Sequence, residues 1–318
     1  MKGVRPILVI VGPTAVGKTD LSIAVARAVD GEIISADSMQ VYKGMDIGTA
    51  KPTENERQGI PHHMLDVVTP DQEFSVADYQ RMVEETLRSL AERDKTPILT
   101  GGTGLYIRAV LDGFVFDPEA RDEELRVQLE KMASTRGGVV LHQRLAEVDP
   151  DSAKRLHPND HRRVIRALEV YHTTGQPLSR HLAAQKRQPP RHPSVKFGLT
   201  RNRRRLYDRI NLRVDLMMET GLLDEVKQLM SQGLEGSATA LQALGYKELV
   251  GYLRGEYDLT EAVRRLKRDT RRYAKRQLTW FRRDQEIIWL DLDQISREDA
   301  VEKITGIYWR NFHTEHEI

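Results

Sequence analysis

Residues Gly12 to Thr19 form a glycine-rich loop with the pattern G-x-x-x-x-G-K-[ST]. The aliphatic run Ile7 to Val11 before the loop predicts a buried strand, and Lys18 to Val29 has the periodicity of a helix. Such a unit points backbone N–H groups and the positive end of a helix dipole into the turn. We therefore predict a di- or triphosphate site formed by Gly12, Pro13, Thr14, Ala15, Val16, Gly17, Lys18 and Thr19. In it, Lys18 neutralises phosphate oxygens and Thr19 holds a Mg²⁺ ion.

The loop alone does not decide what happens to the bound phosphates. Most proteins with this loop bind and cleave ATP or GTP, so a nucleotide-binding protein is one interpretation. The Asn-Lys-x-Asp signature with which GTPases read their base is absent from the sequence. An allylic diphosphate fits the same cradle as the leaving group of an alkyl transfer. Both chemistries stay open at this point.

Two further polar positions follow predicted strands. Asp37 comes directly after the second predicted strand, Glu32 to Ala36, and Thr103 stands in a glycine turn after the third, Thr96 to Leu99. Ligands of an open parallel sheet bind at the carboxyl ends of its strands, so we expect both residues at the phosphate site. Asp37 suits a Mg²⁺ ligand, a helix cap or a general base. The glycine turn suits either a tight connection or a pyrophosphate contact.

Arg213 is a third candidate, because it lies four residues after Arg209 and shares one face of a predicted helix with it. A pair of arginines at this spacing often belongs to the solvent-exposed, charged face of a helix. The sharper hypothesis places the Arg213 guanidinium on a leaving diphosphate, where negative charge develops during the reaction.

The elements that must position these residues alternate between strands and helices, including a long predicted helix over Val76 to Arg93. This alternation predicts an α/β fold, with a P-loop NTPase-like parallel sheet flanked by helices. From Pro118 to Lys186 the pattern changes to helices separated by glycine and proline breaks. We expect a core domain from residues 1–115 and 190–318, with an all-helical insertion domain at 116–189.

The rest of the core is predicted from the sequence after the insertion. Val195 to Leu199 predicts a strand that returns to the sheet, and helices dominate from Arg203 to Arg283. A last strand at Ile287 to Leu292 precedes a terminal helix at Arg297 to Phe312.

Composition and charge narrow the function further. The 318 residues are 39% apolar and 30% charged, and the net charge of +2 hides a segregation. Arg191 to Arg213 carries +7 and Glu261 to Arg283 carries +8, so the remainder carries −13. The absence of cysteine excludes disulfides, thiol nucleophiles and cysteine-ligated metals. The run Ile7 to Val11 is far too short for a membrane span, so we expect a cytoplasmic protein without a membrane partner.

The second basic segment predicts a nucleic-acid partner. At helical spacing one line of the helix carries Arg264, Arg268, Arg271, Lys275 and Arg282. The opposite side, which we expect in the core, carries Val263, Leu266, Tyr273, Trp280 and Phe281. A solvated helix usually alternates its charges, whereas here only two acids interrupt a cationic face suited to RNA phosphates. A membrane-surface helix would need more exposed apolar bulk.

Seven ordered segments together carry a resemblance to a known family. They are Gly12 to Thr19, Asp37 to Tyr42, Gly44 to Pro52, Gly101 to Tyr106, His157 to Asp160, Arg166 to Val170 and Gln277 to Arg282. From about Pro6 to Trp289 the chain closely resembles the bacterial tRNA dimethylallyltransferases, the MiaA family. The resemblance implies transfer of a dimethylallyl group from dimethylallyl diphosphate to the exocyclic amine of adenosine 37, beside the anticodon of tRNA.

The resemblance also implies roles for single residues. Asp37 matches the general base, Thr19 and Thr103 match hydroxyls near the diphosphate, and Arg213 matches the arginine that stabilises the leaving group. Matched stretches, together with two arginines of the basic helix, give the expected tRNA-binding residues: Asp37, Ser38, Met39, Gln40, Thr103, Arg126, Arg162, Arg163, Val164, Ile165, Arg166, Gln242, Gly245, Tyr246, Lys247, Arg268 and Arg271. The expected cofactor is Mg²⁺ on Thr19. The expected partners are the tRNA anticodon stem-loop and dimethylallyl diphosphate, bound by a monomer.

Two other functions compete with this prediction. A P-loop kinase could use Asp37 as a base toward a small hydroxyl substrate. A nucleotide-gated RNA-binding protein would need no chemistry at all. The basic helix disfavours the kinase, since a small substrate needs no such surface, and Asp37 with Arg213 disfavours the protein without chemistry.

Overall fold

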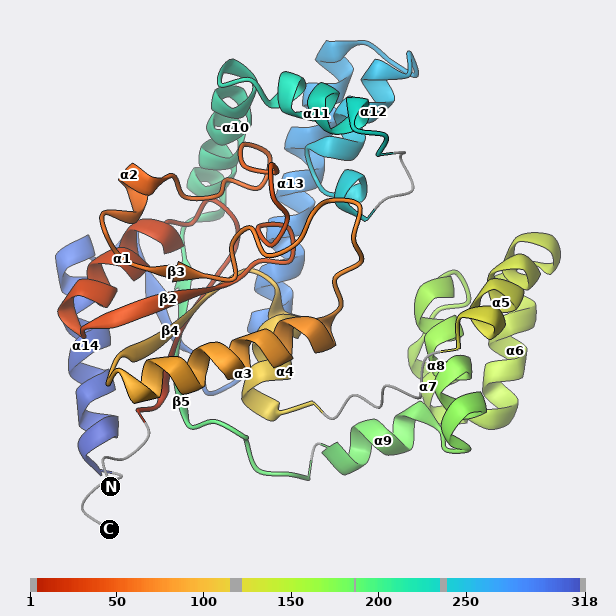
Figure 1. Ribbon diagram of the computed structural model, residues 1–318, viewed down its shortest axis with the longest axis horizontal. Coiled ribbons are helices and arrows are strands. Elements are labelled where there is room, and N and C mark those ends of the chain that lie inside the picture. Colours follow the sequence, from red (N-terminus) through yellow and green to blue (C-terminus); the bar gives the residue numbers. More distant parts are fainter. Residues whose placement is uncertain (1–4, 115–121, 186, 235–238, 315–318) are drawn as a thin grey trace. The chain divides into compact units, whose positions relative to one another are not determined.

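A computed structural model describes residues 5–314 apart from 115–121, 186 and 235–238, and it divides into two units (Figure 1). One unit combines Met1–Leu111 with His192–Ile318, and the other spans Asp112–Arg191. The second unit begins and ends within a few residues of the helical segment expected at 116–189.

The first unit is built on a six-stranded sheet whose neighbouring strands are all parallel, in the order β3-β2-β4-β1-β5-β6. Its strands are β1 (Ile7–Val11), β2 (Gly31–Ala36), β3 (His62–His63), β4 (Thr96–Gly101), β5 (Ser194–Thr200) and β6 (Ile288–Asp291). Every residue of β1 and β2 is buried, as expected for a parallel sheet covered on both faces. The predicted α/β fold with a parallel sheet is confirmed.

Helices cover both faces of this sheet (Figure 1). On one face, Leu8 and Ile10 of β1 belong to a core shared with α1 (Lys18–Ala28) and α14 (Arg297–Thr314). On the other, alternate β1 residues pack with α3 (Val76–Glu92) and α4 (Gly104–Asp112). Because successive side chains of a strand point to opposite faces, one short aliphatic run serves two cores.

A third core joins four helices to the chain after β2. The helices are α10 (Arg203–Glu219), α11 (Leu222–Ser231), α12 (Tyr246–Leu253) and α13 (Leu259–Phe281). They enclose Val41, Tyr42 and Met45, which follow the Asp37 turn. The loop that begins at the carboxyl end of β2 is therefore anchored in a helical core.

The second unit contains five helices among its described residues. They are α5 (Glu123–Arg136), α6 (Gly138–Val148), α7 (Pro150–Arg155), α8 (His161–Thr174) and α9 (Leu178–Gln185). Leucines such as Leu141, Leu145 and Leu168 fill its core.

Glu169 of α8 is a charged residue in this unit whose side chain is nevertheless fully buried. Arg126 donates to both of its carboxylate oxygens, at 3.0 and 2.9 Å, and Arg166 donates to one at 2.8 Å. Burial opposes ionisation, but these hydrogen bonds outweigh it and lower the pKa of Glu169.

Two short elements were not expected from the sequence. α2 (Glu54–Arg57) is a single turn, and β3 consists of two histidines that pair with Ile33 and Ile34 of β2. His62 bonds the Ile60 carbonyl, while His63 bonds Glu32. Elements this short leave no hydrophobic period in the sequence. β3 depends on its pairing with β2, and α2 is stabilised by a capping box between Thr53 and Glu56.

We predict that Glu169→Gln destabilises the helical unit by about 1–3 kcal/mol, because the amide replaces one acceptor oxygen with an NH₂ group that points donors at guanidinium donors and leaves polar groups unsatisfied. Urea unfolding, with amide hydrogen exchange followed on α5 and α8, measures the loss. The stabilisation comes from a lowered carboxyl pKa, so in the native protein it is present above the unfolded pKa and is lost as the pH falls through the folded one. Glu147→Gln, an exposed position on α6, is the control, and equal losses in the two variants would contradict the prediction.

Candidate functional site

The glycine-rich loop lies between β1 and α1, and two arginines form hydrogen bonds to its backbone carbonyls. Arg209 Nε donates to the Ala15 carbonyl and Arg201 Nε to the Val16 carbonyl, both at 2.9 Å. The N–H and C=O groups of one trans peptide point in opposite directions, so fixing these carbonyls fixes the direction of the following amides. Gly17 has φ of 113°, in the left-handed region that favours glycine, at the point where the loop enters α1.

Lys18 lies in this loop without a carboxylate contact. Its Nζ donates to the Gly12 and Pro13 carbonyls, both at 2.9 Å. Burial, reinforced by the positive charge of Arg213 and opposed by Asp37, lowers the pKa of Lys18 to about 7. An anion placed beside Lys18 would remove this penalty.

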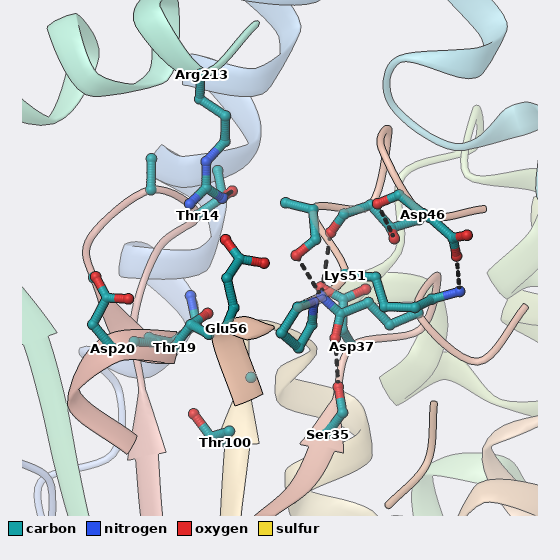
Figure 2. A pocket seen from close by; sticks show the side chains of 18 of the residues that line it. Thr14, Thr19, Asp20, Ser35, Asp37, Asp46, Lys51, Glu56, Thr100 and Arg213 are labelled. Carbon is teal, nitrogen blue, oxygen red and sulfur yellow. Dashed lines mark hydrogen bonds and ion pairs between the residues drawn. The ribbon is translucent and has the colours of Figure 1, made fainter. Parts of the chain in front are cut away.

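Most of the predicted catalytic and phosphate-binding residues line one cavity of about 560 Å³ (Figure 2). Thr14, Lys18 and Thr19 come from the phosphate loop, Asp37 from the turn after β2, and Arg213 from α10. Figure 2 shows Arg213 beside Thr14, with Asp37 farther along the cavity. The three elements thus bring cationic groups together with Asp37, and the carboxylates of Asp20, Asp46 and Glu56 also line the cavity.

Asp37 is held by its own turn, because its carboxylate accepts the Met39 N–H at 2.9 Å. Burial raises the pKa of Asp37, and this effect outweighs the backbone hydrogen bonds and the nearby Lys18 charge, which lower it. A carboxylate with a raised pKa is a stronger base than one in water. The geometry therefore supplies a proton acceptor inside the cavity.

Arg213 contacts the phosphate loop only weakly, through Nη1 and the Thr14 hydroxyl at 3.4 Å. Burial and the like charge of Arg209 lower its pKa. A guanidinium carries five N–H donors, so most of those of Arg213 remain for a ligand.

Thr103 lies behind the Asp37 turn and does not line the cavity. Its hydroxyl oxygen accepts the Ser38 N–H at 3.1 Å, and its own N–H donates to the Ala36 carbonyl at 3.0 Å. Gln40, also expected to contact tRNA, lines the cavity and bonds Ser35 as well as the carbonyls of Thr49 and Ala50.

One important carboxylate was missed from the sequence. Glu225 of α11 accepts from the N–H groups of Asp46, Ile47 and Gly48, at 2.9, 2.8 and 3.1 Å, and from the Tyr246 hydroxyl at 2.7 Å. It thereby clamps the loop that forms one wall of the cavity. The segment Gly44 to Pro52 was noted, but nothing in the sequence linked it to a residue about 180 positions later.

The same loop contains a buried lysine. Lys51 donates to the Tyr42 carbonyl at 2.8 Å and forms ion pairs with Asp46 and Asp66 at 2.5 and 2.6 Å. Its charge is thus satisfied within the loop.

The expected tRNA-binding residues fall into three groups. Val164, Ile165 and Tyr246 are buried, and their side chains pack in cores. Arg126 and Arg166 are engaged with Glu169. The exposed members are Arg162, Arg163, Gln242 and Lys247.

The basic face of α13 is more internally paired than its sequence indicated. Arg264 and Arg265 both bond Glu261, and Arg268 and Arg272 both bond Asp269. Arg271 instead donates to the neutral Asn211 side chain at 2.6 Å. Two acids therefore offset part of the charge without removing it.

Trp280 corrects a second expectation about this helix. We expected it in the core, but it is 37% exposed, whereas Phe281 is buried. Gly104, which has no side chain, leaves the space against which the indole packs. The helical period places Trp280 near the edge of the core. Its exposed fraction then depends on the space left by Gly104, which the period of α13 does not indicate.

Among the described residues, none of the helices combines the length and the apolar character needed to cross a bilayer. The described part of the chain also has no group of three His, Cys, Asp or Glu side chains that could hold a metal ion.

A glycine-rich phosphate loop at the carboxyl edge of a parallel sheet, facing a buried carboxylate and an arginine, defines a P-loop-type enzyme site for a diphosphate. The sequence profile of the IPP transferase family matches residues 40–284. The chain belongs to this family, and it is a prenyltransferase. The resemblance seen in the sequence is confirmed.

Individual relatives are similar over most of the chain. The tRNA dimethylallyltransferase of Halothermothrix orenii is 56% identical over 286 residues, which cover 90% of this chain and 87% of that protein. The solved tRNA isopentenylpyrophosphate transferase of Bacillus halodurans matches with a TM-score of 0.73 and 44% identity, covering 98% and 99% of the two chains. A eukaryotic dimethylallyltransferase, captured acting on tRNA, matches with a TM-score of 0.79 and 32% identity over 93% of this chain and 78% of that one.

We predict that pyrophosphate binding becomes proton-linked above pH 7, because free Lys18, with its pKa of about 7, must regain a proton to face an anion. Below that pH Lys18 is already charged, and its contribution to affinity is constant. Above it the dissociation constant should rise by up to about tenfold per pH unit. Calorimetry in buffers of different ionisation enthalpy measures the number of protons taken up on binding. Lys18→Met corrects for protonation of pyrophosphate itself, and identical proton uptake in both proteins would refute the assignment.

For the Glu225 clamp, we expect Glu225→Gln to speed hydrogen exchange at the amides of residues 46–48 by about tenfold or more, because an amide group turns N–H donors toward some of these donors. Glu219→Gln, at an exposed position of α10, should leave those amides unchanged. Unchanged exchange in Glu225→Gln would show that the loop is held by other contacts.

Proposed function

We propose that this protein transfers a dimethylallyl group from dimethylallyl diphosphate to the exocyclic amine of adenosine 37 in tRNA. The observation that carries the proposal is the single cavity in which Lys18, Thr19 and Arg213 stand together with the carboxylate of Asp37. Relatives named as tRNA dimethylallyltransferases cover about nine-tenths of the chain or more.

The chemistry follows from the charges around the cavity. The amine nitrogen forms a bond to the allylic carbon as the carbon–oxygen bond to diphosphate breaks, and Asp37 accepts the amine proton. The oxygen that leaves carries the bonding electrons, and the phosphate-loop amides, Lys18 and Arg213 stabilise its negative charge. An exocyclic adenine amine is a weak nucleophile, so holding it near the carbon contributes much of the rate.

The residues present fit a Mg²⁺ ion bound mostly by the ligand. Thr19 supplies a hydroxyl at the phosphate loop, and the absence of a three-residue metal cluster among the described residues suits an ion that keeps waters and phosphate oxygens as ligands. When bound, Mg²⁺ would neutralise diphosphate charge. Thr19 is the residue we assign to it.

The basic surface of α13, like the cavity beside it, is compatible with a tRNA substrate. α13 presents its remaining positive charge to solvent while two of its side chains, Tyr273 and Gln277, reach the cavity wall. Cations on such a face bind RNA phosphates, and a base in an anticodon loop is extruded at low cost because it is already unpaired. The anticodon stem-loop is the part that we propose is bound, by a cytoplasmic monomer.

The function is tested by incubating the protein with Mg²⁺, dimethylallyl diphosphate and unmodified tRNA, followed by mass spectrometry of the nucleosides. We expect prenylated adenosine. ATP hydrolysis without any prenylated nucleoside would reject the proposal in favour of a nucleotide-cleaving enzyme.

Asp37→Asn tests the base in the same assay. We expect kcat to fall by about 10²–10⁴-fold, the usual range for loss of a general base, while tRNA affinity changes little. Since the pKa of Asp37 is raised, wild-type activity should decline as the pH falls through that value and the carboxylate becomes protonated. Asp71→Asn, in an exposed loop, is the control. Equal losses of turnover and tRNA affinity would assign Asp37 to binding.

A further inference from the structure

The side chain of Gln277 joins the two glycine loops of the site. It projects from α13, is only 5% exposed and uses both ends of its amide. Its Oε1 accepts the Thr14 N–H at 2.9 Å, and its Nε2 donates to the Gly102 carbonyl at 3.1 Å. A Cβ at Gly102 would overlap this amide, so the second glycine turn is shaped around it.

One hydrogen-bond partner of Gln277 belongs to the loop proposed to hold the diphosphate, and the other lies next to a residue that bonds the turn of Asp37. Thr14 belongs to the phosphate loop, and its hydroxyl contacts Arg213 at 3.4 Å. Gly102 precedes Thr103, which bonds the backbone on both sides of Asp37, at the Ala36 carbonyl and the Ser38 N–H. A continuous series of hydrogen bonds therefore runs from the diphosphate cradle through Gln277 to the turn that holds the base.

We propose that Gln277 is a positioning residue that sets the separation between the diphosphate cradle and Asp37. The inference rests on the proposed prenyl transfer and assigns to that site a role that the phosphate-loop pattern did not identify. In an alkyl transfer the leaving oxygen, the allylic carbon and the attacking nitrogen must be in line, and an error of about 1 Å costs roughly 100-fold in rate. Gln277 touches neither diphosphate nor amine in this assignment and acts through the two loops.

An amide is the side chain that this position requires. One end must accept from an N–H and the other must donate to a carbonyl, and the carboxamide carries an acceptor and a donor at a fixed spacing. Tyr273, one turn earlier on α13, places its hydroxyl beside the side chains of Thr103 and Gln277, and burial raises its pKa, so the group stays neutral. The amide is thus held from a rigid helix rather than from either loop.

Gln277→Met keeps much of the volume and removes both hydrogen bonds. We expect kcat for tRNA prenylation to fall by about 100-fold, whereas the KM for dimethylallyl diphosphate stays within about threefold, because the phosphate loop itself is intact. Thr279→Ala, an exposed position on the same helix, should keep wild-type kinetics. Rates are taken per folded molecule, with folding measured by pyrophosphate-binding stoichiometry.

Gln277→Glu distinguishes a positioning role from a merely structural one, because only a positioning role makes the kcat of the variant depend on the protonation of residue 277. The introduced carboxylate repels the Gly102 carbonyl, but its protonated form donates to that carbonyl as the amide does. The ratio of variant to wild-type kcat should therefore rise by about tenfold or more as the pH is lowered from about 9 to about 6, since each pH unit changes the protonated fraction by up to about tenfold. Taking the ratio cancels the titration of Asp37.

Three outcomes would overturn the inference: an unchanged kcat in Gln277→Met, a loss confined to KM, or a pH-independent ratio for Gln277→Glu. The wild-type protein in the same experiment separates this inference from the proposed function. If wild type forms no prenylated adenosine, the proposed function fails. If wild type is active and the variants behave like Thr279→Ala, only the role of Gln277 fails.

Discussion

The site depends on holding the buried cations Lys18 and Arg213 at one cavity. Burial lowers the pKa of both Lys18 and Arg213, and like charge adds to it: Arg213 acts on Lys18, and Arg209 acts on Arg213. The Lys18 ammonium group is partly stabilised by hydrogen bonds to two backbone carbonyls of the phosphate loop. That loop is in turn fixed by hydrogen bonds from Arg201 and Arg209. The cavity is therefore preorganised for a polyanion, because its cationic groups and loop amides are held in place by other parts of the fold.

The walls of the cavity follow a common design, in which one polar side chain satisfies several backbone groups of a loop. Glu225 does so for residues 46–48, Gln40 for Thr49 and Ala50, and Gln277 for the two glycine turns. Loops built around backbone N–H and C=O groups lose their shape unless those groups are paired. Each of these side chains comes from an element that packs in a core, so the rigidity of the cores is passed to the loops.

The sequence located the sheet, and the glycine-rich loop between its strand and its helix, because both leave local signals. β1, the loop and α1 are consecutive, and the carboxyl-edge rule placed Asp37 beside them. Glu225 and Gln277 could not be placed in this way, because their partners lie about 180 and 263 residues away. The same limit explains the exposure of Trp280, which depends on a distant glycine, and the burial of Tyr246, which packs on Gly48.

The order of the strands has a consequence for how the chain is made. β1 lies at the centre of the sheet, between β4 and β5, so the phosphate loop at its end lacks one neighbouring strand until the chain beyond the helical unit has been synthesised. The amide of Thr14 then receives Gln277 only 263 residues later, which at about 5–20 residues per second is roughly 10–50 s of translation. The bond between Gln277 and the Thr14 amide is therefore among the last contacts of the phosphate loop to form, after nearly the whole chain has been synthesised.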